Sequence, residues 1–413
     1  MNAPVDAVGA SPVDPIGTLG PTPPIRRRAA RPGRTWTWAV AAVAVALLAG
    51  AGTSFGWFGQ PGSGYSGNCP TGQRLLGDGA GFLLPIMSVW ASSYSANTSN
   101  SINYNPAGAG AGIAALSNRL VDFAATDEPL SMADYGTLPG VVLTLPVTGG
   151  ALAIPYDLPG VSAPIRLDGS VLAGIYLGTI AQWNDPALEA LNPGVVLPAH
   201  AIQTVHRADA AGTTYVLSDY LSKESSAWSH GPGRGIQLSW PSAPLQQAAL
   251  GNSKVVEYVA KTPYAIGYAD LADVLAVSGL QYASLQNPSG SFIRPDLAST
   301  ASAIDDFANT TQFPSASAPW TNVSLVDAAG PTDYPMVTFA YFLVFQDARA
   351  GFAPSSAKTQ ALVQWLDWVI QAGQAVAPTL DYVGLPAPVL ALDRSAIGTI
   401  SFEGDRVSCS ALG

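Results

Sequence analysis

Strand-like and helix-like segments alternate along this chain from Cys69 onward, and this alternation constrains the fold more than any other feature. Continuous apolar runs at 141–147 and 339–345 are typical of buried strands. Apolar residues recur with helical spacing at 83–94 and 362–369. The chain has 413 residues, which is enough for two domains. The pattern therefore predicts an α/β protein with a sizeable core.

The segment TVHRADAAGTTYVLSDYL (204–221) has the features of an anion-binding site. Arg207 and Asp209 precede a small-residue turn, and Thr213 then opens a helical pattern. The first turn of a helix offers unpaired backbone N–H groups and the positive end of the helix dipole. A nearby arginine adds a fork of donors that suits an oxyanion. The segment predicts a cradle for a small anion; the alternative is a structural salt bridge between Arg207 and Asp209.

Two more glycine-rich turns precede helical patterns, at 77–81 (GDGAG) and 108–112 (GAGAG). Asp127 follows a strand-like stretch, and ligands of open α/β sheets gather at the carboxyl ends of strands. A single glycine turn carries little information, but three of them with Asp127 and Arg207 indicate one site. The alternative role for Asp127 is the N-cap of a helix that begins at Glu128–Pro129.

Composition excludes several classes of function. Net charge is −10 with a pI near 4.6, so the chain lacks the basic surface that a nucleic-acid partner requires. The histidines His200, His206 and His230 do not have the spacing of zinc ligands. Motifs for a nucleophile elbow or a dinucleotide site are also missing. The sequence predicts a binding protein and not an enzyme, with neither metal nor cofactor.

The N-terminal region predicts the location of the protein. Residues 1–34 are rich in Pro, Gly and Ala, carry five arginines near their end, and are expected to form a disordered cytoplasmic tail. An uncharged apolar run within 35–59 is long enough to cross a bilayer, and 60–68 reads as a linker. This predicts a single-pass cell-membrane protein with its main domain outside. The alternative is a signal peptide cleaved near Ala49–Ala51, followed by secretion.

Two cysteines, Cys69 and Cys409, lie near the two ends of the region that follows the linker. In an oxidising compartment they are expected to form a disulfide. The alternative is a pair of unrelated thiols.

Several blocks of sequence, in the same order, resemble the phosphate-binding proteins of bacterial phosphate-specific ABC importers. The resemblance covers nearly all of 75–395 and implies a type II periplasmic-binding-protein fold, in which crossing hinge strands join two α/β lobes around a ligand cleft. It implies a first lobe at 69–148, a second lobe at 149–282, and crossover loops with a return to the first lobe at 283–413. The blocks are GDGAGFLLPIMSVWASSY (77–94), INYNPAGAGAGIAALSNRLVDFAATDEPLS (102–131), HRADAAGTTYVLSDYLSK (206–223), TPYAIGYADL (262–271) and YPMVTFAYFLVFQD (334–347).

Carried over residue by residue, the resemblance implies a ligand shell. Asp127 matches a carboxylate that accepts the proton of phosphate, and Arg207 matches a bidentate arginine. Three positions depart from the family, because Gly81 replaces a threonine and Ala109 and Ala211 replace serines. Each departure removes a hydroxyl donor, and a hydrogen bond to a charged group contributes about 1.5–3 kcal/mol. The implied shell is Gly81, Phe82, Ala109, Gly110, Asp127, Arg207, Ala211, Gly212 and Thr213.

The resemblance implies a membrane-anchored, extracytoplasmic protein that binds phosphate or a related oxyanion. Closure of the cleft would deliver the ligand to an ABC permease. The missing hydroxyls, together with the anchor, favour an alternative. In that alternative the protein is an interaction module with a weakened or lost anion site, acting as a sensor or an accessory subunit of an envelope membrane complex.

Overall fold

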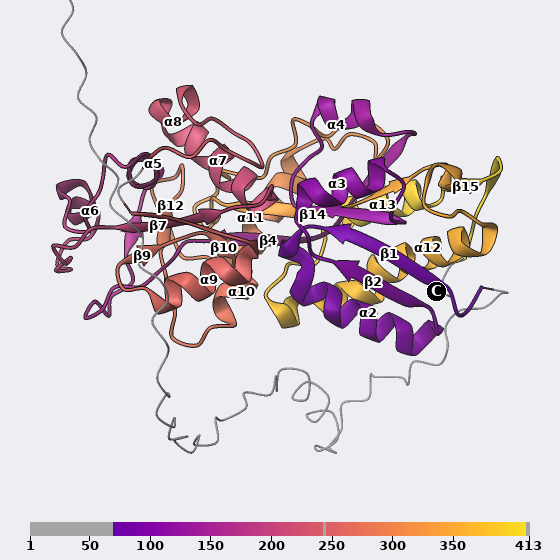
Figure 1. Ribbon diagram of the computed structural model, residues 1–413, viewed down its shortest axis with the longest axis horizontal. Coiled ribbons are helices and arrows are strands. Elements are labelled where there is room, and N and C mark those ends of the chain that lie inside the picture. The colour runs from indigo at the N-terminus through magenta and orange to yellow at the C-terminus, as the bar shows by residue number, and fades with distance from the viewer. Residues whose placement is uncertain (1–68, 243–244, 410–413) are drawn as a thin grey trace, which may run out of the picture. The chain divides into compact units, whose positions relative to one another are not determined.

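A six-stranded sheet forms one half of the structure, a computed structural model that describes residues 69–242 and 245–409 (Figure 1). Strand β1 pairs in parallel with β2 and β3, while β14 pairs antiparallel with both β3 and β4. The strands, in sheet order, are β10 (Ala269–Asp270), β4 (Val142–Ala153), β14 (Val337–Phe345), β3 (Phe123–Thr126), β1 (Arg74–Gly79) and β2 (Ser101–Asn105).

A five-stranded sheet forms the other half. Its strands β7 and β8 are parallel, as are β7 and β9, and β5 runs antiparallel to both β9 and β11. In sheet order the strands are β11 (Gln281–Tyr282), β5 (Pro155–Tyr156), β9 (Ala265–Ile266), β7 (Gln203–Arg207) and β8 (Gln246–Ala249). A small three-stranded sheet contains, in order, β13 (Phe292–Ile293), β12 (Ser284–Gln286) and β6 (Arg166–Leu167). A two-stranded sheet contains β15 (Ser401–Phe402) and β16 (Asp405–Arg406).

The chain passes between the two main sheets through short extended segments. Strand β4 is continuous from Val142 to Ala153, so it runs through the boundary expected at 148/149, and β5 follows it after Ile154. The chain returns after β9, because β10 pairs antiparallel with β4. These strands also join the cores, because Leu152 of β4 and Val337 of β14 belong to the same buried apolar cluster as Ile266 of β9.

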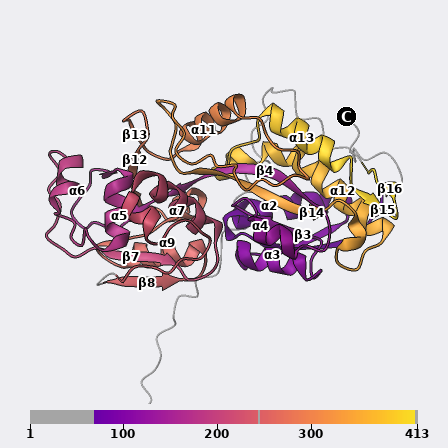
Figure 2. The ribbon, with the colours of Figure 1, turned by 90° about the horizontal axis from the view of Figure 1, so that it is seen from above.

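Helices cover both faces of the six-stranded sheet, and the alternation of side chains along its strands divides the core accordingly. On β3, Phe123 and Ala125 pack with α2 and α12, whereas Ala124 packs with α3. Figure 2 shows α3 on the side of the sheet away from α13. The helical segments around this sheet are η1 (Gly81–Leu83), α2 (Leu84–Thr98), α3 (Ala109–Ser117), α4 (Met132–Thr137), η2 (Ala348–Ala350), α12 (Ser356–Val369), η3 (Ala372–Ala375), η4 (Ala377–Leu380) and α13 (Ala387–Ile397).

The remaining helices accompany the five-stranded sheet or join the two halves. Helix α11 packs against β4 and β14 of the six-stranded sheet, although it follows the second half in sequence. These helices are α5 (Gly169–Leu177), α6 (Pro186–Leu191), α7 (Gly212–Glu224), α8 (Ser226–His230), α9 (Gly251–Lys261), α10 (Leu271–Leu275) and α11 (Leu297–Thr310).

The crossover loops expected from 283 onward are interrupted by a helix, α11. Its Ala residues favour a helix, but its Ser, Thr, Asp and Asn residues favour one less, so the local signal is mixed. The signal that identifies its start is Asp296, whose carboxylate accepts from the backbone N–H of Ser299 at 2.8 Å, in a capping box with Ser299.

Among residues 69–242 and 245–409, no helix combines the length and the apolar character needed to cross a bilayer. The tail, the membrane helix and the linker expected at 1–34, 35–59 and 60–68 lie outside the described residues.

A disulfide joins Cys69 and Cys409, whose Cα atoms are 5.7 Å apart and which are separated by 340 residues in sequence. It therefore links the N-terminal and C-terminal ends of the described chain. A cross-link of this kind restricts the unfolded chain and thereby stabilises the folded state.

We expect the double substitution Cys69→Ser and Cys409→Ser to lower the free energy of unfolding by roughly 2–5 kcal/mol. Equilibrium denaturation in urea, with the oxidised wild type as the reference, measures the change. Identical midpoints and slopes for the two proteins would contradict this prediction.

Candidate anion-binding site

The predicted site residues lie where strands of both sheets end (Figure 1). In the six-stranded sheet, η1 follows β1, α3 follows β2, and Asp127 follows β3. In the five-stranded sheet, Arg207 is the last residue of β7, and α7 begins at Gly212. Because β1, β2 and β3 are parallel, their carboxyl ends meet at one edge and bring the helix starts together.

Glycines allow the two sides of the cleft to touch. The backbone N–H of Gly110 donates to the carbonyl oxygen of Ala210 at 3.4 Å. A Cβ atom on Gly110 would lie 2.8 Å from the Cβ of Ala210, and a Cβ on Gly212 would collide with the carboxylate of Asp127. The sequence therefore needs glycine at these positions for close approach of the backbone.

Arg207 is buried, with 4% of its surface exposed, and is held by a network of acceptors. Its Nε donates to Asp209 Oδ1 at 2.8 Å, and its Nη2 donates to the other carboxylate oxygen. Its Nη1 donates to Thr213 Oγ1 at 2.9 Å and to Asn252 Oδ1 at 2.6 Å. Four of the five guanidinium N–H donors thus have protein acceptors.

The salt bridge with Asp209 is present, and it orients the guanidinium toward the first turn of α7. Burial disfavours the charged form of Arg207, but the charges of Asp209, Tyr268 and Asp127 outweigh burial and raise the arginine pKa. Burial likewise acts to raise the pKa of Asp209, but Arg207 outweighs it and lowers that pKa. The two residues therefore form a stable ion pair at the wall of the cleft.

Asp127 is 2% exposed and lies against Gly212, across the cleft. Burial raises its pKa to about 6, although the charge of Arg207 and the N–H of Gly212 oppose the shift. The alternative role as a helix N-cap is wrong, because the next helix, α4, begins at Met132. That helix is capped by Ser131.

The turn formed by Gly81 and Phe82 is fixed by two tyrosines that sequence reasoning missed. Tyr104 donates its hydroxyl hydrogen to the carbonyl of Ala80 at 2.6 Å, and the Tyr382 hydroxyl lies 2.6 Å from the carbonyl of Phe82. The Phe82 ring is in the core, 5.7 Å from the ring of Tyr382, so only its main chain is available to a ligand. A Cβ on Gly81 would meet no atom within 4 Å.

Ala109 and Ala211, whose side chains are methyl groups without a donor, are both buried. The N–H of Ala211 already donates to the carbonyl of Ile236 at 2.9 Å. The contacts described above join Asp127 to Gly212 and Arg207 to Thr213, and they join Gly110 to Ala210 in the same turn. Gly81 and Phe82 join them less directly, because η1 lies against α9, which carries Asn252.

Asn252 and Tyr268 also belong to this network and were not predicted. The Tyr268 hydroxyl accepts from the backbone N–H of Arg207 at 3.0 Å and shares a hydrogen bond with Thr214 at 2.7 Å. The signal for Asn252 was available, because Gly251 and Asn252 open a helix directly after a strand, as the predicted turns do. The hydroxyl of Tyr268 gives no local signal.

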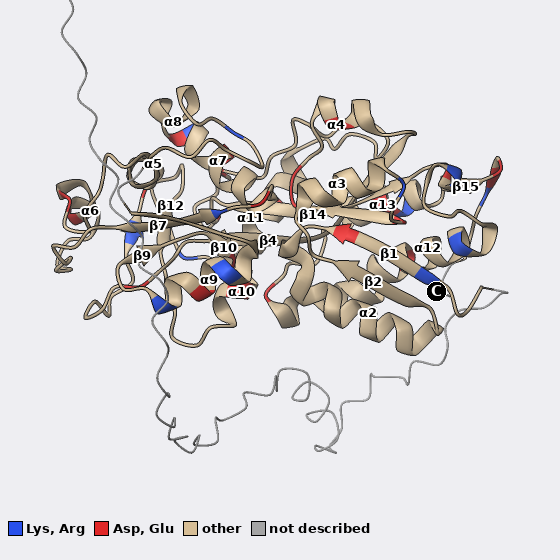
Figure 3. Cartoon of the chain, in the orientation of Figure 1, with Lys and Arg blue, Asp and Glu red and all other residues tan. Residues whose placement is uncertain are grey.

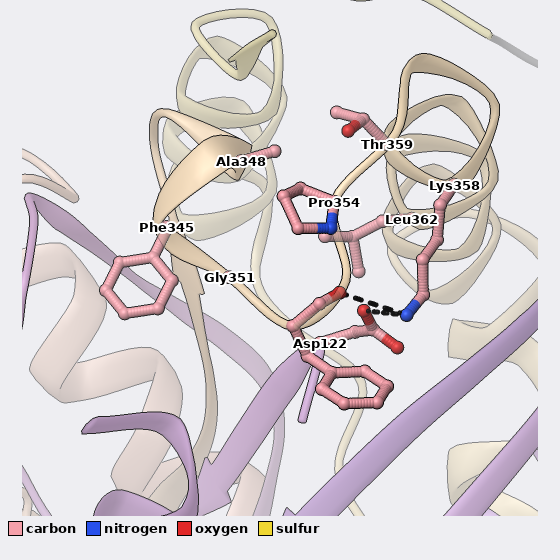
Figure 4. A pocket seen from close by; sticks show the side chains of 9 residues that line it. Asp122, Phe345, Ala348, Gly351, Pro354, Lys358, Thr359 and Leu362 are labelled. Carbon is pink, nitrogen blue, oxygen red and sulfur yellow. Dashed lines mark hydrogen bonds and ion pairs between the residues drawn. The ribbon is translucent and has the colours of Figure 1, made fainter. Parts of the chain in front are cut away.

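Pockets also lie away from this site. The cavity in Figure 4 measures about 20 Å³ and is lined by the ion pair of Lys358 with Asp122, at 2.8 Å. A larger and more open pocket of about 610 Å³ lies beside Arg234 and Leu238. Figure 3 shows charged residues scattered over both halves of the coloured chain. Among the residues that the structure describes, no group of three or more His, Cys, Asp or Glu side chains could hold a metal ion.

The raised pKa of Asp127 predicts how this residue affects stability. A proton on Asp127 is bound more tightly in the folded state, so its stabilising contribution is complete below about pH 4 and is lost as the pH rises through about 6. Asp127→Asn removes this dependence. Thermal and urea unfolding should find the variant more stable than the wild type at pH 7, by up to about 3 kcal/mol, and nearly equal to it at pH 4. A difference that is the same at both pH values would contradict the assignment.

Comparison with known proteins places the chain in a family. A PBP superfamily domain matches residues 61–372. The phosphate-binding protein PstS of Pasteurella multocida (strain Pm70) is 36% identical over 322 residues, which cover 77% of this chain and 88% of that protein. PstS of Methanocaldococcus jannaschii is 31% identical over 337 residues, covering 78% of this chain and 85% of that protein.

Solved structures agree on the fold. The high affinity periplasmic phosphate-binding protein PfluDING superposes with a TM-score of 0.63 at 20% identity, covering 78% of this chain and 93% of that chain. The phosphate-binding protein of Stenotrophomonas maltophilia gives 0.60 at 17% identity, with the same coverage. The expected bilobal α/β fold of a periplasmic binding protein is thereby confirmed. The chain belongs to the PBP superfamily and, within it, to the PstS family.

Proposed function

We propose that this protein binds phosphate in the cleft between its two halves and presents it, outside the cytoplasm, to an ABC importer. One observation carries the proposal: Asp127 and Arg207, from different sheets, are both buried where helices α3 and α7 begin. The relatives named PstS support the choice of phosphate. Membrane anchoring through 35–59, delivery to a permease, and the nine-residue shell remain parts of the same proposal.

The chemistry of binding follows from the donors around Arg207. Among residues 69–242 and 245–409, one Nη2 hydrogen of the guanidinium has no acceptor, and an oxyanion could also displace Thr213 from Nη1. Thr213 would then donate its hydroxyl hydrogen to the ligand. The first N–H groups of η1, α3 and α7 supply neutral donors. This set would compensate in part for the hydroxyls that Gly81, Ala109 and Ala211 lack.

Asp127 would select phosphate by its proton. Above about pH 6 its carboxylate is ionised and accepts a hydrogen bond from a protonated phosphate. Sulfate has no proton to donate at this pH, so a buried carboxylate would repel it and remain without a partner.

The alternative function is an interaction module whose anion site is weakened or lost. It is favoured by the pairing of four Arg207 donors with protein acceptors and by the contact of Gly110 with Ala210. In that case the protein would serve as a sensor or accessory subunit of an envelope membrane complex. Titration with anions separates the two functions.

We expect isothermal titration calorimetry at pH 7.5 to detect binding of phosphate and arsenate and to detect no binding of sulfate. Asp127→Asn should lower the preference for phosphate over sulfate by at least about tenfold, because it removes the charge and adds a donor. Absence of heat and of thermal stabilisation with every anion would reject phosphate binding and favour the interaction module.

Restoring a hydroxyl should strengthen binding. Gly81→Thr fits without steric conflict, since a Cβ there meets no atom within 4 Å. Because the added hydroxyl can donate a hydrogen bond to phosphate, calorimetry should find an affinity for phosphate that is roughly 10–100-fold higher than that of the wild type. Gly136→Thr is the control, because Gly136 also has open space but lies in α4. Equal affinities for both variants and the wild type would show that residue 81 does not face the ligand.

A further inference from the structure

Asn252 occupies a position in the cleft that the predicted shell does not include. It is the second residue of α9, which follows β8 in the way that α7 follows β7. Its exposed fraction is 3%. Its Oδ1 accepts from Arg207 Nη1 at 2.6 Å and from Thr213 Oγ1 at 3.4 Å. Asn252 therefore contacts two residues proposed to bind the anion.

The contact with Arg207 fixes the orientation of the side-chain amide. A guanidinium group only donates hydrogen bonds, so the amide atom that faces Arg207 must be the oxygen. The amide nitrogen is thereby directed elsewhere, and among the described residues this buried Nδ2 has no partner with hydrogen-bond geometry. A buried donor without an acceptor costs about 1–3 kcal/mol, so this nitrogen requires an explanation.

Helix α9, which carries Asn252, packs against η1. In η1 a Cβ on Gly81 would meet no atom within 4 Å, so there is open space at that turn. On α10, Asp273 is the charged neighbour. Burial raises its pKa, while a hydrogen bond from Ser253, the charge of Arg207 and the side-chain amide of Asn252 lower it, so one N–H of that amide is directed toward this carboxylate. The Ser253 hydroxyl donates to Asp273 Oδ1 at 3.1 Å, so Asp273 has a partner of its own. An amide has two N–H groups, and at least one of them remains available.

We infer that Asn252 is a ligand residue whose side-chain NH₂ group donates a hydrogen bond to the bound oxyanion while its oxygen holds Arg207. The inference rests on the proposed binding of phosphate and extends it. It also gives a reason for the loss of the hydroxyl at Gly81, because a neutral donor from α9 can serve the same side of the ligand. An amide adds no charge of its own, so it strengthens binding without a second buried ion.

Two substitutions in the full-length protein separate a ligand role from a positioning role. Asn252→Asp keeps an oxygen acceptor for Arg207 but replaces the NH₂ group by a second oxygen. If Asn252 donates to the ligand, calorimetry with inorganic phosphate at pH 7.5 should find affinity at least about 30-fold lower, since a donor is lost and a charge is added. If Asn252 only positions Arg207, the stronger acceptor should keep affinity within about threefold, and that result would overturn the inference.

Lys254→Gln provides the matched control for charge. Like Asn252→Asp it lowers the charge by one unit, but it does so two residues away, at a side chain that is 67% exposed, and it leaves the amide and the Ser253–Asp273 hydrogen bond intact. We expect its phosphate affinity to stay within about threefold of the wild type at 0.15 M salt, because exposed charge is screened. A loss equal to that of Asn252→Asp would assign the effect to charge alone and overturn the inference.

Asn252→Ala covers the case in which Asn252→Asp does not fold. It should weaken phosphate binding by about 10–100-fold while thermal unfolding confirms a folded protein. Unchanged affinity in this variant would again overturn the inference. A wild type that binds no phosphate would instead reject the proposed function, and the ligand role of Asn252 with it.

Discussion

The contact between Asp127 and Gly212 is the interaction on which the cleft depends. It places a carboxylate from one sheet at the positive end of a helix that belongs to the other, so the closed arrangement gains a favourable charge–dipole interaction. The same contact removes the carboxylate from water. Burial outweighs both the helix and Arg207, since the pKa of Asp127 is raised to about 6. The charge of ionised Asp127 is therefore only partly compensated, which supports the proposed preference for a ligand that brings its own proton.

Arg207 shows why the site cannot rely on charge alone. Asp209 already neutralises it through two hydrogen bonds, and Asp127 adds a further negative charge nearby. An incoming anion would meet a local excess of carboxylates. Binding must then come from neutral donors that are fixed in place: backbone N–H groups at helix starts, hydroxyls and amides. For anion binding, the geometry of the turns and of Tyr104 and Tyr382, which hold one of them, therefore matters more than the net charge of −10.

The sequence predicted those strands and helices whose signal lies within a short segment of the chain. Apolar runs located β4 and β14, helical spacing located α2 and α12, and the turn before Thr213 located the start of α7. Contacts between distant segments had no such signal. Tyr382 meets the carbonyl of Phe82 from 300 positions away, and Asn252 reaches Arg207 across 45. Nothing in the local pattern distinguishes these polar side chains from solvated ones, and α11 was not predicted because its Ser, Thr, Asp and Asn residues favour helices less than Ala does.

Opening of the cleft about the crossing strands would depend on pH, because the closed arrangement buries Asp127. Any opening around β4 and β10 must separate Gly110 from Ala210 and expose Asp127 to water. Hydration would return the pKa of Asp127 toward its ordinary value, because burial is the main cause of the shift. Closing an empty cleft between about pH 4 and pH 6 would then take up a proton from solvent. At higher pH, in the proposed function, a protonated phosphate would donate a further hydrogen bond to Asp127 and so favour closure when the ligand is present.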